Sequence, residues 1–207
     1  MYFLVKILAI GMDCLSGMLI LTPVLIILQK MRGRKVRSLS MGFLLLYLCT
    51  LAGIFSVTGL PDIKYMRLDF SVNYIPMIDI LNSPSQYLLN VLMFVPIGFL
   101  LPLIWKKYGD WRYVLGFACF LTVFIEAAQV FTFRTTDIDD LLTNLLGAGL
   151  GYLAVRALAD RLHIALPASQ AGEKEPAGGP FLVFFLAFLV NFFIQPYWSA
   201  FFWDTIL

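Results

Sequence analysis

The sequence predicts an all-α fold, a polytopic transmembrane helical bundle of about six spans with both termini outside. Of its 207 residues, 60% are hydrophobic and 14% are charged, whereas soluble domains are about 25% charged. The apolar residues gather into runs of roughly 18–20 residues, which is long enough to cross a bilayer core of about 30 Å. Lys and Arg are concentrated in every second connection between these runs. These three observations together predict a multi-pass membrane protein.

The spans follow one another along the chain. We expect them at Leu4–Leu28, Met41–Leu60, Tyr87–Trp105, Tyr113–Phe131, Asp140–Leu158 and Pro180–Trp203. The first differs from a signal peptide, because its basic flank KMRGRK follows the apolar run and a small-residue cleavage site is missing. The last is separated from the fifth by ALPASQAGEKEPAGGP, a polar segment rich in Gly and Pro. Such a composition is typical of a flexible linker.

The basic residues predict the orientation of the bundle. Of the 15 Lys and Arg residues, 11 lie after the first, third and fifth spans. Cytoplasmic loops carry an excess of Lys and Arg, so these connections are expected in the cytoplasm and both termini outside. The connection 61–86 mixes Tyr, Phe and Met with charges and two prolines. It is too polar to span, and we expect it to lie along the outer membrane surface.

Two polar residues lie near the outer end of the fourth span. Glu126 and Gln129 are three residues apart, so they share one face of a helix. At 1.5 Å per residue, Glu126 lies about 8 Å below the outer boundary. An ionised carboxylate facing lipid at that depth would cost several kcal/mol. Glu126 is therefore expected to face the protein interior.

The fifth span carries a second polar face. Asp140, Asn144, Gly147 and Gly151 step by four, three and four residues, which places them on one side of a helix. The two glycines form a GxxxG, a pattern that lets another helix approach closely. Asn90 stands at the outer start of the third span.

These side chains are predicted to converge in one outward-facing polar pocket. Its members come from three spans and one loop: Asn90, Glu126, Gln129, Arg134, Asp137, Asp140 and Asn144. Intramembrane ionisable residues are functional candidates by default. In an enzyme, Glu126, Arg134 and Asp140 would be catalytic, and the other four would bind the ligand.

Structural roles compete with each of these assignments. Thr136 and Asp139 have the spacing of a capping box, and acids suit a helix N-terminus. Arg134 is also placed to pair with Glu126 and hold the loop. Asn90 and Asn144 are the type of side chain that hydrogen-bonds between membrane helices.

Metal, cofactor and nucleic-acid functions find no support. Cys14, Cys49 and Cys119 lie inside apolar runs without metal-ligand spacing, and such cysteines are typical small buried hydrophobes. The net charge is +2, and the basic residues form short clusters between spans. That distribution carries topology information and does not form a phosphate-binding face.

The polar pattern resembles the signature of the VanZ-like family. It reads Glu126-x2-Gln129-x4-Arg134-x2-Asp137-x2-Asp140-x3-Asn144-x2-Gly147-x3-Gly151. Upstream, NVLMFVPIGFLLP is similar to a second block of that family, with Asn90, Phe94, Pro96 and Gly98. In that block the resemblance marks Pro96 and Gly98 as helix-packing residues, as Gly147 and Gly151 are in the first. NYIPM resembles a third, shorter segment, although Met77 stands where an aromatic residue is expected.

The resemblance divides the chain into four parts. Residues 1–40 form the first span and a basic cytoplasmic loop, and residues 41–160 form a VanZ-like core of four spans that includes 61–86. A cytoplasmic linker follows at 161–180, and a C-terminal span occupies 181–207. The family implies a multi-pass protein of the bacterial cytoplasmic membrane. Some members confer resistance to teicoplanin, a lipoglycopeptide that acts outside the cell.

Three functions compete at this stage. The first is a pocket that binds or modifies a lipid-linked envelope precursor or other membrane lipid, or that lowers the binding of a lipoglycopeptide antibiotic. The second is a structural partner of another envelope protein, in which the polar cluster only locks helices. The third is a proton-coupled transporter, which is disfavoured because the inner halves of the third, fourth and fifth spans lack charge and no inverted repeat is evident.

Overall fold

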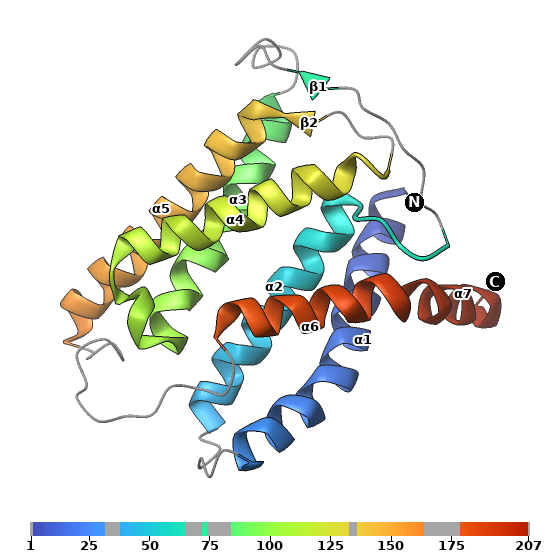
Figure 1. Ribbon diagram of the computed structural model, residues 1–207, viewed down its shortest axis with the longest axis horizontal. Helices are drawn as coiled ribbons and strands as arrows, with labels where there is room; N and C mark the ends of the chain where they lie inside the picture. The colour runs from blue at the N-terminus through green and yellow to red at the C-terminus, as the bar shows by residue number, and fades with distance from the viewer. Residues whose placement is uncertain are drawn as a thin grey trace. The chain divides into compact units, whose positions relative to one another are not determined.

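The computed structural model describes residues 2–31, 38–64, 72–73, 84–132, 136–163 and 179–206. These residues are almost entirely helical (Figure 1), which confirms the predicted all-α class. In chain order the helices are α1 Tyr2–Met31, α2 Ser38–Thr58, α3 Pro84–Ile104, the 3₁₀ helix η1 Lys106–Gly109, α4 Trp111–Gln129, α5 Ile138–Leu162, α6 Pro180–Phe193 and α7 Gln195–Ile206. Two residue pairs, β1 Val72–Asn73 and β2 Thr136–Asp137, form a short parallel ladder.

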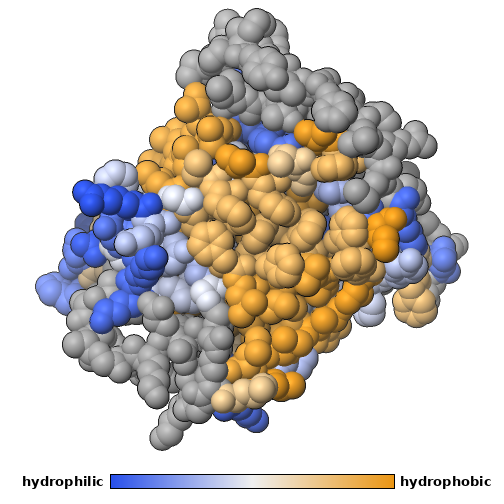
Figure 2. All heavy atoms as spheres, viewed as in Figure 1, coloured by the Kyte–Doolittle hydropathy of each residue, from blue (hydrophilic) through white to orange (hydrophobic). Residues whose placement is uncertain are grey.

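The helices have the length and composition of membrane spans. Among the described residues, five single helices are long and apolar enough to cross a bilayer, and α6 with α7 adds a bent candidate that brings the total to six. Many large apolar side chains are exposed on these helices, and Figure 2 shows them in orange over much of the visible face. Such surfaces suit contact with lipid rather than water. The chain is therefore a multi-pass membrane protein, while the placement of its termini stays a prediction.

The last apolar run is two helices rather than the single one expected over 180–203. The axes of α6 and α7 differ by 48°. Pro196 is the cause, because proline has no N–H to donate to the carbonyl four residues earlier and its ring crowds that carbonyl. The carbonyl in question, Phe192 O, instead accepts a hydrogen bond of 3.2 Å from Ile63 N. The segment after α2 thus satisfies the backbone group that the proline leaves free.

The chain forms two compact units. Unit 1 comprises residues 1–67 and 176–207 and contains α1, α2, α6 and α7. Its core is built on α2, where Leu44, Tyr47 and Leu51 are fully buried. At the α1–α2 contact, the Cys49 thiol lies 3.3 Å from Met18 Sδ. The three cysteines are free thiols, and each is half-buried rather than buried as the sequence predicts.

Unit 2 comprises residues 68–175 and contains α3, η1, α4 and α5. Helices α3 and α5 run side by side, and α4 packs across them (Figure 1). The η1 end of this unit is aromatic, with Trp105, Tyr108 and Phe117 buried. There the Tyr152 hydroxyl donates a hydrogen bond of 2.8 Å to Gly109 O. Aromatic packing and a hydrogen bond from a side chain to the backbone therefore stabilise this end.

Several predicted features fall outside the described residues. They are the basic loop at 32–37, most of the surface segment 61–86, Arg134 and most of the linker at 164–178. Asp137 is described by its backbone pairing alone. The four-part division of the chain remains a prediction.

Candidate functional site

Glycines set the distance between α3 and α5. A Cβ at Gly147 would collide with Val91 O, and one at Gly151 would collide with Val95 O. Both contacts advance by four residues on each helix, so α3 and α5 run parallel in one register. The GxxxG of α5 thus lies directly against the α3 backbone, which is the close approach that such small residues permit.

Residues of α3 complete this close contact. Gly98 faces Ala148 of α5, whose carbonyl a Cβ at Gly98 would meet. Pro96 lies within α3, between the contact residues Val95 and Gly98, and leaves the helix unbroken. Because the two helices are parallel and in register, their N-terminal ends lie at the same end of unit 2. The polar residues of both helices are concentrated at that end.

Asn90 and Asp140 meet at this polar end. Asn90 Nδ2 donates a hydrogen bond of 2.6 Å to Asp140 Oδ1. Asn90 is 8% exposed, and Asp140 is half-buried. The short distance is typical of a hydrogen bond to a carboxylate. Two residues predicted to share a pocket are therefore in direct contact.

A second hydrogen bond joins the same two helices. The Tyr87 hydroxyl donates to Asp139 Oδ2 at 2.6 Å, and Asp139 is 3% exposed. Thr143 Oγ1 donates to Asp139 O at 2.8 Å. The Asp139 carboxylate reaches across to α3, a contact that the sequence does not predict. The capping box of Thr136 and Asp139 stays a prediction, because the Thr136 side chain lies outside the described residues.

A polar stripe on α4 contributes the third part of the site. Thr122, Glu126 and Gln129 are spaced by four and three residues, so they lie on one helix face. Thr122 and Gln129 are buried, and Glu126 is half-buried. The helix ends immediately afterwards, where Thr132 Oγ1 donates to Gln129 O at 3.1 Å. The stripe therefore runs from the interior of α4 to its C-terminal end.

Thr122 and Asn144 each bury an oxygen that has no hydrogen-bond partner among the residues that the structure describes. The two atoms are Thr122 Oγ1 and Asn144 Oδ1. Asn144 is 4% exposed and Thr122 is fully buried. Burying a hydroxyl or an amide oxygen without a hydrogen bond costs about 1–3 kcal/mol in proteins. Such atoms usually find a partner, which makes them markers for a bound group.

The short strand ladder brings a distant segment to this end. Val72 pairs with Thr136, and Asn73 pairs with Asp137, in parallel register. The pairing holds residues 72–73 beside the residues that lead into α5. The backbone of the surface segment is therefore anchored next to the polar end at that point.

Two polar residues of this end are absent from the sequence prediction. Tyr87 lies three residues before Asn90 and so on the same helix face. Thr122 lies four residues before Glu126. Helical spacing would have identified both. Among the described residues, no group of three or more His, Cys, Asp and Glu side chains is placed to hold a metal ion.

Comparison with known families agrees with the helical and polar pattern. The VanZ/LLP1 family profile matches residues 41–159, which is more than half of the chain. This range covers α2 from residue 41 onward and the described helices of unit 2 as far as residue 159 in α5. Searches of curated proteins and of solved structures give no significant match. The chain is a member of the VanZ/LLP1 family.

Proposed function

We propose that this protein works in the bacterial cytoplasmic membrane, where the polar end of unit 2 binds a lipid-linked molecule of the cell envelope. The observation that carries the proposal is the pair of buried oxygens, Thr122 Oγ1 and Asn144 Oδ1, without a bonding partner among the described residues. A ligand with hydroxyl or amide donors would supply what these atoms lack. Lipid-linked envelope precursors carry such donors on their sugars and peptides.

Binding of this kind would interfere with lipoglycopeptides of the teicoplanin type. Those antibiotics act outside the cell on envelope material, and the predicted orientation puts the polar end on the outer side. Arg134 belongs to the same loop as β2, and a guanidinium is well suited to hold a phosphate by two parallel hydrogen bonds. The proposed ligand therefore has an anionic group next to hydroxyl and amide donors.

Modification of the ligand would need a group that moves a proton. Asp140 Oδ1 already accepts a hydrogen bond from Asn90, which holds that carboxylate in one orientation. Glu126 is half-buried on the neighbouring helix and is the better candidate for a general acid or base. Such a group contributes about 10²–10⁴ to a reaction rate.

The test replaces Glu126 by glutamine in a host that is sensitive to teicoplanin. The readouts are the inhibitory concentration of the antibiotic and the mass-spectrometric profile of the lipid-linked precursors. If Glu126 moves a proton, Glu126→Gln should lower the amount of any modified lipid at least about a hundredfold. Asp160→Asn is the matched control, because Asp160 is exposed near the other end of α5. Unchanged protection and an unchanged lipid profile in Glu126→Gln would eliminate the acid–base role.

A structural role is the second candidate, and two observations favour it. The hydrogen bonds from Asn90 to Asp140 and from Tyr87 to Asp139 both join α3 to α5. If the polar end only locks helices for a protein partner, Glu126→Gln lowers the melting temperature and leaves the activity per folded molecule intact. If the polar end binds a ligand, the variant folds normally and loses protection.

A further inference from the structure

Five exposed cations lie at the η1 end of unit 2. Lys106 and Lys107 belong to η1, and Arg112 lies in the first turn of α4. Arg156 and Arg161 lie near the C-terminal end of α5. All five side chains are exposed. Figure 2 shows hydrophilic side chains in blue at the left of the view, where α5 ends in Figure 1.

The fold brings two basic segments together that are separate in the sequence. The hydroxyl of Tyr152 donates a hydrogen bond of 2.8 Å to Gly109 O, across a separation of 43 residues. Arg156 follows Tyr152 by four residues, so it lies on the same face of α5, one turn nearer to the helix end. Arg156 is therefore expected beside the turn between η1 and α4, the turn that carries Lys107 and Arg112.

Aromatic rings accompany two of these cations. Lys107 Nζ lies 4.3 Å from the centroid of the Tyr113 ring, and Arg112 Cζ lies 5.9 Å from that of Trp111. Both rings are themselves exposed, Trp111 by 53% and Tyr113 by 45%. A cation over an aromatic face is attracted by the ring quadrupole. Exposed Trp and Tyr are enriched at the level of the lipid headgroups, so these cations are expected at the membrane boundary.

Acidic side chains balance only part of this charge. Residues 105–112 and 152–163 contain five Lys and Arg but only two acids, Asp110 and Asp160, which gives a net charge of +3. The Asp110 carboxylate accepts a hydrogen bond of 3.0 Å from Arg112 N and caps α4. The η1 end therefore attracts anions.

Apolar side chains lie next to the cations on the side of the bilayer core. Leu153 precedes Arg156 by three residues and is 62% exposed, and Leu150 is 46% exposed. An inorganic anion would need only the cations. A phospholipid has its phosphate at the membrane boundary and its acyl chains directly below, which is the same order of groups.

We propose that the η1 end of unit 2 binds the phosphate of an anionic phospholipid. Lys107, Arg112 and Arg156 surround the phosphate, and a guanidinium can hold it by two parallel hydrogen bonds. The surplus of positive charge selects a headgroup with a net negative charge over one that also carries a cation. Basic sites between membrane helices on the cytoplasmic side bind such headgroups, and the predicted orientation puts this end there. The site lies at the opposite end of α3 and α5 from the polar end and does not depend on the function proposed there.

The test measures lipid binding by the full chain in detergent micelles with native mass spectrometry. The probes are phosphatidylglycerol and phosphatidylcholine with identical acyl chains, and sodium phosphate alone. One Lys or Arg near an anionic lipid surface changes affinity about fivefold. The wild type should therefore bind phosphatidylglycerol at least about fivefold more tightly than phosphatidylcholine. Equal affinities for the two lipids would overturn the proposal, and displacement of phosphatidylglycerol by phosphate at equal concentration would overturn the assignment to a lipid.

Lys107→Gln should weaken phosphatidylglycerol binding about fivefold and leave phosphatidylcholine binding unchanged. Lys64→Gln is the matched control, because Lys64 is also exposed and also lies over a tyrosine ring, that of Tyr197, but belongs to unit 1. Substitutions of such exposed side chains rarely disturb folding. Equal losses in the two variants would contradict a site at the η1 end.

A double-mutant cycle tests whether both segments hold the same phosphate. Arg112→Gln removes a cation of α4, and Arg156→Gln removes one of α5. If the two guanidinium groups share one phosphate, their effects on phosphatidylglycerol affinity should not add in the double variant. Strictly additive effects would mean a general attraction to anionic surfaces and would contradict the shared site.

Discussion

The two ends of the α3–α5 pair in unit 2 are built from opposite kinds of contact. At the η1 end, Val155 and Ala159 of α5 pack against Phe99 and Leu103 of α3. At the other end the same two helices bury Asn90, Asp139 and Asn144 instead. The helices, their register and their apolar surroundings are shared, so the difference between the ends lies in the side chains alone.

The comparison shows that these two helices can be packed together with few buried polar side chains. The contacts of the η1 end include packed rings, aliphatic side chains and the hydrogen bond from Tyr152 to a backbone carbonyl. Burying amides and carboxylates adds a desolvation cost that apolar packing avoids. The hydrogen bonds to Asp139 and Asp140 offset part of that cost. The oxygens of Thr122 and Asn144 have no partner among the described residues, so there part of that cost is not offset by them.

The largest expected effect comes from the glycine seam, the close contact of Gly147 and Gly151 with the α3 backbone, which lies between the two ends. Gly147→Ala puts a Cβ onto the α3 backbone at Val91. Because the clash is between two helix backbones, no side chain can rotate to relieve it. We expect a loss of about 3 kcal/mol and a melting temperature lower by about 6–12 °C. Thermal unfolding in detergent measures it.

Gly149→Ala is the control on the same helix. There the nearest atom to a new Cβ is Leu115 Cδ2, at 4.0 Å, which is ordinary van der Waals contact. Its melting temperature should be unchanged or slightly raised, because alanine favours helix more than glycine does. Equal destabilisation by both variants would contradict the assignment of Gly147 to the seam.

A pair of tyrosine variants compares the ends directly. Tyr87→Phe removes the donor to a buried carboxylate, whereas Tyr152→Phe removes the donor to a backbone carbonyl. Hydrogen bonds to charged groups contribute about 1.5–3 kcal/mol and neutral ones about 0.5–1.5 kcal/mol. Tyr87→Phe should therefore lower the free energy of unfolding more than Tyr152→Phe, as chemical denaturation would measure. The reverse order would show that the polar end is the less important of the two for stability.

The smallest effect on stability is expected at Thr122. Thr122→Val keeps the shape of the side chain and removes an oxygen that no described residue bonds. The free energy of unfolding should stay constant or rise by up to about 1 kcal/mol. Protection against teicoplanin should fall in the same variant if the oxygen contacts a ligand. A clear loss of stability would indicate instead that the hydroxyl has a structural partner.

Helical spacing predicted much of the polar end. The steps of four and three residues that relate Asp140, Asn144 and Gly147 place them on one face in the structure as they do in the sequence. Asn90 and Asp140 can touch because both lie near the N-terminal ends of their helices and so at a similar depth in the predicted membrane. Helical spacing did not predict that Asp139 accepts a hydrogen bond from Tyr87. That contact depends on how closely α3 approaches α5.

The break in the last apolar run shows the opposite situation. Its composition is that of one continuous span, and Pro196 alone is a weak signal, because Pro23, Pro96 and Pro102 all lie inside unbroken helices. What differs at Pro196 is the external donor, Ile63 N, which satisfies the freed carbonyl of Phe192. Membrane helices accommodate a break where neighbouring groups replace the lost hydrogen bond.

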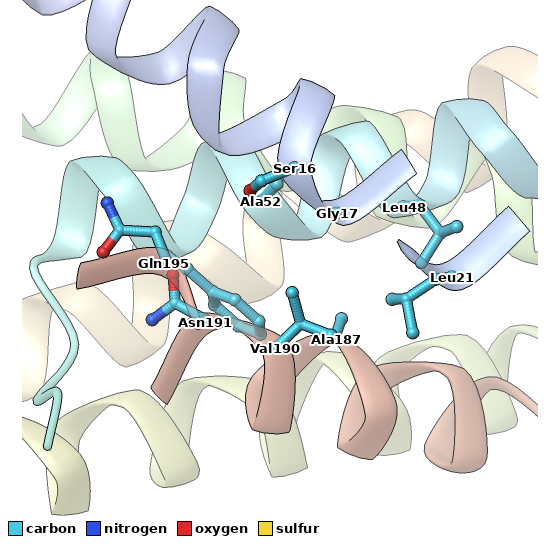
Figure 3. A pocket seen from close by; sticks show the side chains of 10 residues that line it. Ser16, Gly17, Leu21, Leu48, Ala52, Ala187, Val190, Asn191 and Gln195 are labelled. Carbon is cyan, nitrogen blue, oxygen red and sulfur yellow. The ribbon is translucent and has the colours of Figure 1, made fainter. Parts of the chain in front are cut away.

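The sequence by itself determined the class of the protein, the positions of its first five spans, and the faces on which its polar residues lie. These follow from hydropathy and from the 3.6-residue period of the helix, which are local properties of the chain. Only the tertiary structure decided which helices touch. It set the parallel register of α3 and α5 through Gly147 and Gly151, paired Tyr87 with Asp139, and left a hollow of about 20 Å³ beside the break at Pro196 (Figure 3). The reason is that close packing and hydrogen bonding depend on distances between segments far apart in the chain.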